Sequence, residues 1–308
     1  MKFTKMHGCG NDYIYIDGSR ETVEDKPELA RLLSDRHFGV GGDGIIFINP
    51  SDIADFEMEM YNADGSRGKM CGNGIRCVAK YVYDKGLTNQ NPVKIESCGS
   101  IKTLFLNTKD GKVDTVRVDM GEPEFEAAKI PANPAATGGG ADEKGRLIGV
   151  PYTVNEEEMR MTAVSMGNPH AVIFLEDCLP AAADQGTPDK AASDKAVPDR
   201  TDPDSLDLER TGPFYEHHPA FPEGVNTEFV QVIDRTHLKM RVWERGSGET
   251  LACGTGACAV TAAAVLLGKT ERTVRMQLRG GELEIEWNAS DGHIYMTGPA
   301  RTVFEGEI

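Results

Sequence analysis

The chain contains a long internal repeat that aligns without a gap. Residues 58–88 can be placed over residues 240–270 at a fixed offset of 182 positions (253 − 71), which brings Cys71 onto Cys253. Met58, Val78 and several glycines coincide with the same residue types in the second copy. Self-similarity over such a length indicates a duplicated structural unit. We therefore expect two domains of one fold, with a boundary near residues 118–122.

Both copies of the repeat carry the same local pattern. Segments 56–61 and 238–243 alternate as strands do, and each is followed by a Gly-containing turn and then by Cys-Gly-x-Gly. The segment after the second cysteine is small and apolar on nearly all sides, which predicts an enclosed helix. A glycine suited to end each helix follows at Gly86 and Gly268. In the first copy the helical spacing i, i+3, i+4, i+7 is carried by Ile75, Val78, Ala79 and Val82.

The position of the two cysteines points to acid–base chemistry. The N–H groups and the dipole of a helix N-terminus favour a thiolate, so we expect a lowered thiol pKa. The glycines that follow leave these N–H groups free to bind an anion such as a carboxylate. A thiolate base and a thiol acid on opposite sides of one carbon can invert it in both directions. We predict this role for Cys71 and Cys253; the alternative is that both are only buried cysteines.

The remaining cysteines give weaker signals. Cys77 and Cys258 fall on helix bodies and are expected to be structural, whereas Cys9 is ambiguous. No CxxC pair is present, so zinc-ligand spacing is absent and no metal site is expected. A switching disulfide between Cys71 and Cys253 is an alternative to catalysis, and we interpret such a bond as inactivation.

Further polar residues could complete a site. Glu244 and Arg245 follow a strand and could clamp a zwitterionic amino acid, with Arg245 on the carboxylate and Glu244 on the ammonium; a surface ion pair is the alternative. His170 could orient a thiol or a ligand. Several asparagines flank glycine, proline or strand ends, where they reach a cleft or serve only in turns: Asn11, Asn62, Asn73, Asn168 and Asn226.

Charge and composition exclude several classes of function. The net charge of −16 disfavours binding to nucleic acid and to anionic membranes. No apolar run reaches the roughly 20 residues of a membrane span, and the N-terminus lacks the apolar stretch of a signal peptide, so we expect a cytoplasmic protein. The GxGxxG pattern at 39–44 precedes a strand rather than follows one, which argues against a dinucleotide site. Residues 131–146 are expected to form a surface loop and residues 180–205 a flexible acidic insertion.

The chain resembles the diaminopimelate epimerase family along nearly its whole length. Six motifs in family order carry the resemblance: HGCGNDYIYID (7–17), RHFGVGGDGI (36–45), YNADGSRGKMCGNGIRC (61–77), SMGNPHAV (165–172), HPAFPEGVNTEFV (218–230) and VWERGSGETLACGTGAC (242–258). The resemblance implies an α/β (α+β) fold of two pseudo-symmetric domains, each a mixed β-sheet rolled around a central helix. We expect one domain at 1–120 with a returning strand at 299–308, and the other at 121–298.

The family further implies a function and a homodimer. It implies interconversion of LL- and meso-2,6-diaminopimelate in lysine biosynthesis, without pyridoxal phosphate or any other cofactor. Matching positions give Cys71 and Cys253 the acid/base roles, with His170 and Glu244 as neighbours of the reacting centre. Matching positions imply that the distal end of the substrate is bound by Asn11, Asn62, Asn168, Asn226 and Arg245. They imply that the reacting carboxylate is bound by Gly72, Asn73, Gly254 and Thr255.

Two points qualify this resemblance. Some family members carry Gln where this chain has Gly44, so a contact made there is lost or replaced by backbone. A related two-cysteine racemase acting on proline or hydroxyproline would use the same mechanism. The asparagine-rich set and Glu244-Arg245 favour a substrate with a second amino-acid end.

Overall fold

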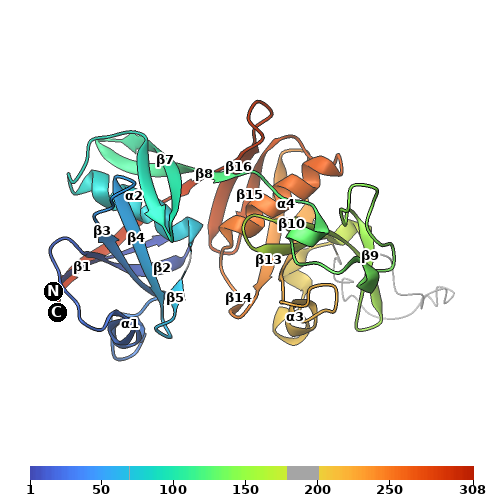
Figure 1. Ribbon diagram of the computed structural model, residues 1–308, viewed down its shortest axis with the longest axis horizontal. Helices are drawn as coiled ribbons and strands as arrows, with labels where there is room; N and C mark the ends of the chain where they lie inside the picture. Colours follow the sequence, from blue (N-terminus) through green and yellow to red (C-terminus); the bar gives the residue numbers. More distant parts are fainter. Residues whose placement is uncertain (69, 179–200) are drawn as a thin grey trace, which may run out of the picture.

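The computed structural model describes residues 1–68, 70–178 and 201–308, which form two lobes side by side (Figure 1). The first lobe is built from the N-terminal part of the chain. Its elements are β1 (Lys2–Gly8), β2 (Asn11–Asp17), α1 (Lys26–Ser34), β3 (Gly44–Asn49), β4 (Phe56–Asn62), β5 (Arg67–Gly68), α2 (Gly72–Asp84), β6 (Val93–Ser97), β7 (Ser100–Lys109) and β8 (Lys112–Gly121).

The second lobe repeats this order with additions. Its strands and helices are β9 (Val150–Val154), β10 (Glu157–Ser165), β11 (Pro169–Phe174), α3 (Leu208–Glu216), β12 (Asn226–Val232), β13 (His237–Glu244), β14 (Gly248–Glu249), α4 (Gly254–Leu266), β15 (Thr273–Leu278), β16 (Gly281–Trp287) and β17 (Ile294–Pro299). Short 3₁₀ turns lie at Ala127–Lys129, Pro134–Ala136, Leu175–Asp177 and Pro203–Ser205. The last strand, β18 (Arg301–Glu307), pairs antiparallel with β1 of the first lobe.

The strands of each lobe form a mixed sheet around one helix. Parallel pairs (β2 with β3, β4 with β6, β11 with β12, β13 with β15) occur among antiparallel neighbours. Helix α2 packs against β1, β2, β6, β7 and β8, and α4 packs against β10, β11, β12, β16 and β17. The expected α/β fold, with a mixed sheet rolled around a central helix, is confirmed.

The internal repeat of the sequence is also a repeat of the structure. Both ends of α4 lie 182 positions after the ends of α2 (254 − 72 and 266 − 84). Gly86 and Gly268 follow the helices with φ angles of 71° and 72°, the left-handed conformation that ends a helix at glycine. The predicted buried face of α2 is inaccessible to solvent. Helix α4 is buried except at Thr255 and its last two residues, because strands surround it.

Contacts between the lobes hold the two helix N-termini close together. Strand β8 pairs antiparallel with β17, so one sheet runs from the first lobe into the second. The Asn73 side-chain amide donates to the Ala252 carbonyl at 3.2 Å, just before Cys253. A Cβ at Gly72 would lie 2.9 Å from Met296 Cε, and one at Gly254 would lie 2.9 Å from Met296 Sδ. A larger residue at either helix start would therefore require the Met296 side chain to move.

Two predictions about loops have different outcomes. The GxGxxG segment lies between α1 and β3, after a helix and before a strand, as expected for a decoy. Of the expected flexible insertion at 180–205, residues 180–200 lie outside the described residues. In the remainder, Asp202 and Asp204 form ion pairs with Lys239, and Arg241 donates to the Pro203 carbonyl. These contacts dock the segment on β13.

Arg76 on α2 is a fully buried cation that joins the helix to the second lobe. It donates to the carbonyls of Pro299 (3.2 Å) and Gly72 (3.1 Å) and to Asn73 Oδ1 (2.9 Å). Removing the side chain takes a donor away from the buried Asn73 Oδ1 and from the Pro299 carbonyl.

We predict that Arg76→Ala lowers the free energy of unfolding by roughly 3 kcal/mol, because buried acceptors are left unsatisfied and a cavity forms. Urea denaturation followed by circular dichroism measures the change. Arg275→Ala, on the exposed face of β15, is the control and should change stability by no more than about 0.5 kcal/mol. Equal effects of the two substitutions would contradict this account of Arg76.

Candidate active site

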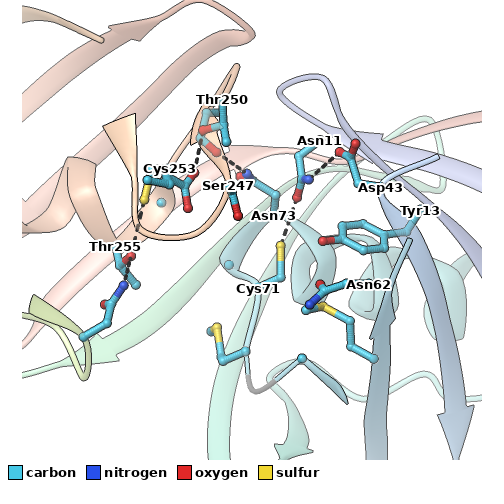
Figure 2. A pocket seen from close by; sticks show the side chains of 18 of the residues that line it. Asn11, Tyr13, Asp43, Asn62, Cys71, Asn73, Ser247, Thr250, Cys253 and Thr255 are labelled. Carbon is cyan, nitrogen blue, oxygen red and sulfur yellow. Dashed lines mark hydrogen bonds between the residues drawn. The ribbon is translucent and has the colours of Figure 1, made fainter. Parts of the chain in front are cut away.

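Both repeat cysteines line one cleft between the lobes (Figure 2). The cleft has a volume of about 1400 Å³ and is lined from both lobes. It contains every residue that the sequence singled out except one: Asn11, Asn62, Cys71, Gly72, Asn73, Asn168, Asn226, Glu244, Arg245, Cys253, Gly254 and Thr255. The exception is His170, which is fully buried behind the wall.

Cys71 is the N-cap residue of α2. Its sulfur accepts a hydrogen bond from the backbone N–H of Gly74 at 3.2 Å, and it lies 3.0 Å from Asn11 Oδ1. Asn11 is held in turn by Asp43, whose Oδ2 accepts from the Asn11 side-chain amide at 2.6 Å. The Tyr13 ring borders the same part of the cleft (Figure 2).

Cys253 has the equivalent position at the start of α4. Its sulfur accepts from the Gly256 N–H at 3.4 Å and lies 3.5 Å from the Thr255 hydroxyl. The Thr255 hydroxyl accepts from the Asn168 side-chain amide at 3.3 Å. Each sulfur is therefore held by a helix N-terminus and by polar side chains from its own lobe.

The expected lowering of the thiol pKa values is wrong. Burial raises the pKa of Cys71, although the N–H groups of Gly74 and Asn73 oppose the rise. Burial, assisted by the carboxylates of Glu244 and Glu228, raises the pKa of Cys253 well above its ordinary value. The helix N-termini do favour the thiolates, but desolvation of both sulfurs outweighs them.

His170 belongs to a buried polar chain beneath Cys253. Its Nδ1 lies 2.6 Å from Glu228 Oε1 and its Nε2 lies 3.0 Å from Asn168 Oδ1. Glu228 is fully buried, and its second oxygen has no hydrogen-bond partner among the described residues. His170 thus connects a buried carboxylate to Asn168, which reaches Thr255 beside the thiol. His170 can therefore orient Asn168 in the wall of the cleft, but it does not line the cleft itself.

Glu244 and Arg245 have separate partners. The Glu244 carboxylate accepts from the Thr250 hydroxyl, and burial raises the pKa of this carboxyl group. The Arg245 guanidinium, which is exposed, donates to the Glu223 carbonyl at 3.0 Å. The alternative of a surface ion pair between Glu244 and Arg245 does not apply, because each has its own partner and both line the cleft.

Two of the asparagines also have local structural roles. Asn226 donates to the Pro169 carbonyl at 2.8 Å and accepts from the Arg245 N–H at 2.9 Å. Asn62 donates to the Ser66 hydroxyl at 3.0 Å within a turn. Gly44 is the first residue of β3 and lies between β2 and β4. A Cβ at Gly44 would come within 2.1 Å of the Tyr61 carbonyl oxygen. A side chain at position 44 would require a different backbone path there.

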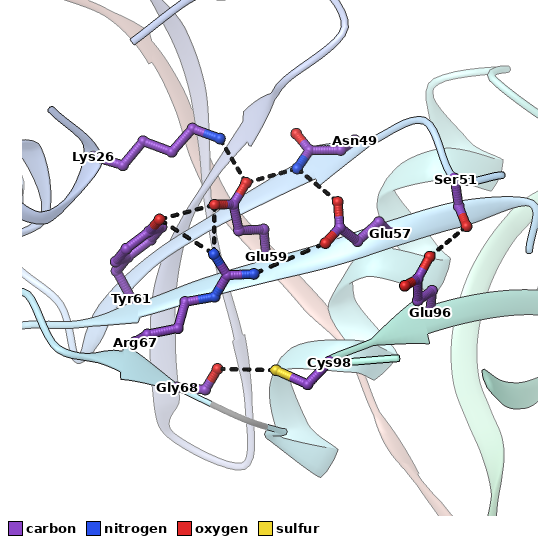
Figure 3. A network of polar contacts seen from close by, with 10 residues as sticks. All are labelled: Lys26, Asn49, Ser51, Glu57, Glu59, Tyr61, Arg67, Gly68, Glu96 and Cys98. Carbon is purple, nitrogen blue, oxygen red and sulfur yellow. Dashed lines mark hydrogen bonds and ion pairs between the residues drawn. The ribbon is translucent and has the colours of Figure 1, made fainter. Parts of the chain in front are cut away.

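The cations of the cleft differ in how well they are neutralised. Arg67 pairs with Glu59 at 2.7 Å in a network that also includes Lys26 (Figure 3). Arg36 pairs with Asp12 and Asp43. Lys102 and Arg245 line the cleft without a carboxylate partner in the described part of the chain. These two are therefore the cations best placed to bind a ligand carboxylate.

The site has groups that suit an anion. In residues 1–68, 70–178 and 201–308, no group of three or more His, Cys, Asp or Glu side chains is arranged to hold a metal. None of the described helices has the length and apolar character that a bilayer crossing requires.

Two helix N-termini open into the cleft with glycine in their first turns, which suits them to bind a carboxylate.

The sequence did not single out several residues of the site. Asp43 and Glu228 act through other side chains, so no local motif marks them. For Glu228 a signal existed: extending the repeat places it at the position of Ile46 (46 + 182), a charge in place of an apolar strand residue. Other cleft residues that the sequence analysis did not name are Tyr13, Lys102 and Thr250.

The fold is shared with solved isomerases and related proteins. A phenazine biosynthesis protein of the PhzF family from Bacillus anthracis superposes with a TM-score of 0.63 at 15% identity, covering 100% of this chain and 98% of that one. A hydroxyproline epimerase from Agrobacterium vitis, with trans-4-hydroxy-L-proline bound, gives 0.62 at 14% identity over 100% and 90%. The chain thus shares the two-lobed fold of these proteins.

Sequence comparison gives the family within that class. The family model described as diaminopimelate epimerase matches residues 3–126 and 196–303. The diaminopimelate epimerase of Acetivibrio thermocellus is 50% identical over 308 residues, covering 100% of this chain and 98% of its own length. That of Methanococcus maripaludis is 48% identical, covering 100% and 99%. The chain belongs to the diaminopimelate epimerase family.

We predict that Glu228→Ala lowers the free energy of unfolding by about 3–5 kcal/mol, because it leaves the buried His170 without its partner. Glu228→Gln should cost less, since the amide oxygen can still accept from His170 Nδ1. Equilibrium denaturation of both variants measures the difference. Glu282→Ala, at an exposed position of β16, is the matched control. A stability of Glu228→Ala equal to that of the control would refute the buried pair.

Proposed function

We propose that this chain interconverts LL- and meso-2,6-diaminopimelate by moving the Cα proton between Cys71 and Cys253, in lysine biosynthesis. Family membership supports the substrate. The single observation that supports the mechanism is that two equivalent helices present their N-cap cysteines to one cleft. Such a pair supplies a base and an acid of the same kind, which a reversible inversion requires.

The proposed reaction has two proton transfers. One cysteine, as thiolate, takes the Cα proton, and the electron pair of the broken C–H bond moves toward the carboxylate. The other cysteine, as thiol, delivers its proton to the opposite face. We assign the reacting carboxylate to the backbone N–H groups of Gly72, Asn73, Gly254 and Thr255, since helix N-terminal amides stabilise the developing negative charge. No cofactor or metal takes part in this scheme.

The distal amino-acid end of the substrate needs groups of both charges. We assign its carboxylate to Arg245, which is exposed to the cleft and lacks a carboxylate partner among the described residues. The polar amides of Asn11, Asn62, Asn168 and Asn226 would hold the rest of that end. His170 and Glu244 are assigned to positions beside the reacting centre, His170 acting through Asn168. Proline and hydroxyproline lack a second amino-acid end, so they would leave this set unused.

The domain division and the assembly state are also proposals. We propose domains at 1–120 with 299–308 and at 121–298, which the pairing of β18 with β1 supports. We further propose a cytoplasmic homodimer without nucleic-acid or membrane partners. The exposed apolar side chains of Val303 and Phe304 on β18 support a second copy as partner. Sedimentation at micromolar concentration decides between monomer and dimer.

We predict that Cys71→Ser and Cys253→Ser each lower kcat for LL-diaminopimelate at least about a hundredfold, because each removes one proton-transfer group. Circular dichroism should show that both variants remain folded. With the unaltered chain in D₂O and no added cofactor, the epimerised product should contain deuterium at Cα. Cys77→Ser, on the body of α2, is the control. Full activity of either active-site variant, or a requirement for pyridoxal phosphate, would exclude the mechanism.

The pH dependence of kcat/KM should be bell-shaped, with its maximum on the alkaline side of neutrality. The active form needs one thiolate and one thiol, so activity rises as the first proton leaves and falls as the second leaves. Burial raises the pKa of both thiols, so each thiol keeps its proton to a higher pH. The pH range in which the enzyme is active therefore moves upward. Initial rates across the pH range test this, and a maximum below pH 7 would contradict it.

A further inference from the structure

The Asn11 side chain lies between a carboxylate and a catalytic-cleft thiol. Its Nδ2 is 2.6 Å from Asp43 Oδ2, and its Oδ1 is 3.0 Å from Cys71 Sγ (Figure 2). Asp43 comes from the loop just before β3, and Asn11 begins β2; Tyr13 pairs with Gly44 in the parallel register of these strands. The three side chains therefore meet through a sheet register, not through a local motif.

The orientation of the Asn11 amide follows from the chemistry of Asp43. An ionised carboxylate can only accept hydrogen bonds. Asp43 also accepts from the Asp12 N–H at 3.1 Å and from Arg36 at 2.9 Å. The amide nitrogen of Asn11 must therefore face Asp43. If the Asn11 amide were flipped, its oxygen and the Asp43 carboxylate oxygen, both acceptors, would face each other at hydrogen-bond distance.

We propose that Asp43 is a positioning residue that, through Asn11, keeps Cys71 in its thiol form while no ligand occupies the cleft. With the amide fixed, Asn11 presents an oxygen to Cys71, and an oxygen can bind only the S–H form. A thiolate at Cys71 would face this oxygen at close range. It therefore forms readily only when a ligand donates a hydrogen bond to Asn11 Oδ1 and the thiol proton passes to solvent.

Cys253 has different partners. The Thr255 hydroxyl can donate or accept, so it suits both protonation states, whereas the Glu244 carboxylate beside the sulfur disfavours the thiolate. The two cysteines are therefore inequivalent despite their symmetric positions on α2 and α4. Other groups that face Cys71 are, from α2, Arg76 and Cys77, from β2, Tyr13 and Tyr15, and from β13, Glu244.

The pH dependence of alkylation at Cys71 tests this role, because iodoacetamide reacts with the thiolate. The full chain is treated across a pH series, and the peptides carrying Cys71 and Cys253 are quantified separately by mass spectrometry. Asp43→Asn removes the acceptor-only carboxylate and frees the amide to turn. We expect its Cys71 midpoint to fall by about one pH unit, the effect of one hydrogen bond to a charged group. The Cys253 midpoint in the same molecules should not move.

A double-mutant cycle separates this route from a direct effect of the Asp43 charge. Asn11→Ala alone should lower the Cys71 midpoint, and Asp43→Asn should cause no further shift in that background. Arg36→Gln is the matched control: it removes a partner of Asp43 but leaves the carboxylate, so the Cys71 midpoint should stay.

Several results would overturn the proposal. They are an unchanged Cys71 midpoint in Asp43→Asn or in Asn11→Ala, an undiminished shift from Asp43→Asn in the Asn11→Ala background, or an equal shift in Arg36→Gln. Should Asp43→Asn fail to fold, Asn11→Ala decides the question alone. The proposal deepens the proposed function and relies on it only for the ligand that releases Cys71. Alkylation needs no substrate, so its failure is distinguishable from absence of epimerase activity.

Discussion

The convergence of two helix N-termini is the constraint on which the rest of the structure depends. Gly72 and Gly254 both pack against Met296, and the β8–β17 pairing holds the lobes at this separation. Two positive dipole ends that face one cleft repel each other unless an anion lies between them. The fold thereby creates a place that suits a carboxylate before any side chain is considered. The cysteines stand at its edges because they are the N-cap residues of those helices.

The same convergence explains why the thiols are poor acids. To stand at the ends of helices enclosed by sheets, both sulfurs must leave water, and desolvation of a thiolate exceeds the benefit of the helix N–H groups. A site that relied on dipoles alone would hold reactive thiolates at all times. In this site, whether a thiolate forms depends on the groups that surround the sulfur.

Much of this architecture could be predicted from the sequence, because its signals are short-range. Helical spacing, the glycines after Cys71 and Cys253, and the constant offset of the repeat specify both helices and their N-caps. The sign of the thiol pKa shifts could not be predicted, since it depends on burial by strands distant in sequence. The pairing of Asp43 with Asn11 depends on the parallel register of β2 and β3, which no local pattern reveals.

The two halves of the duplicated scaffold differ at equivalent positions. A Cβ at Gly74 would meet Ile46 at 2.8 Å, whereas one at Gly256 would meet Glu228 Oε1 at 2.6 Å. One lobe thus supports its helix with an apolar side chain and the other with a buried acid. A catalyst cannot change the equilibrium between two stereoisomers. Two unequal thiols therefore change the affinities for the two stereoisomers and the forward and reverse rates together. The difference between the lobes can thus suit the distal end of the substrate while the reaction remains reversible.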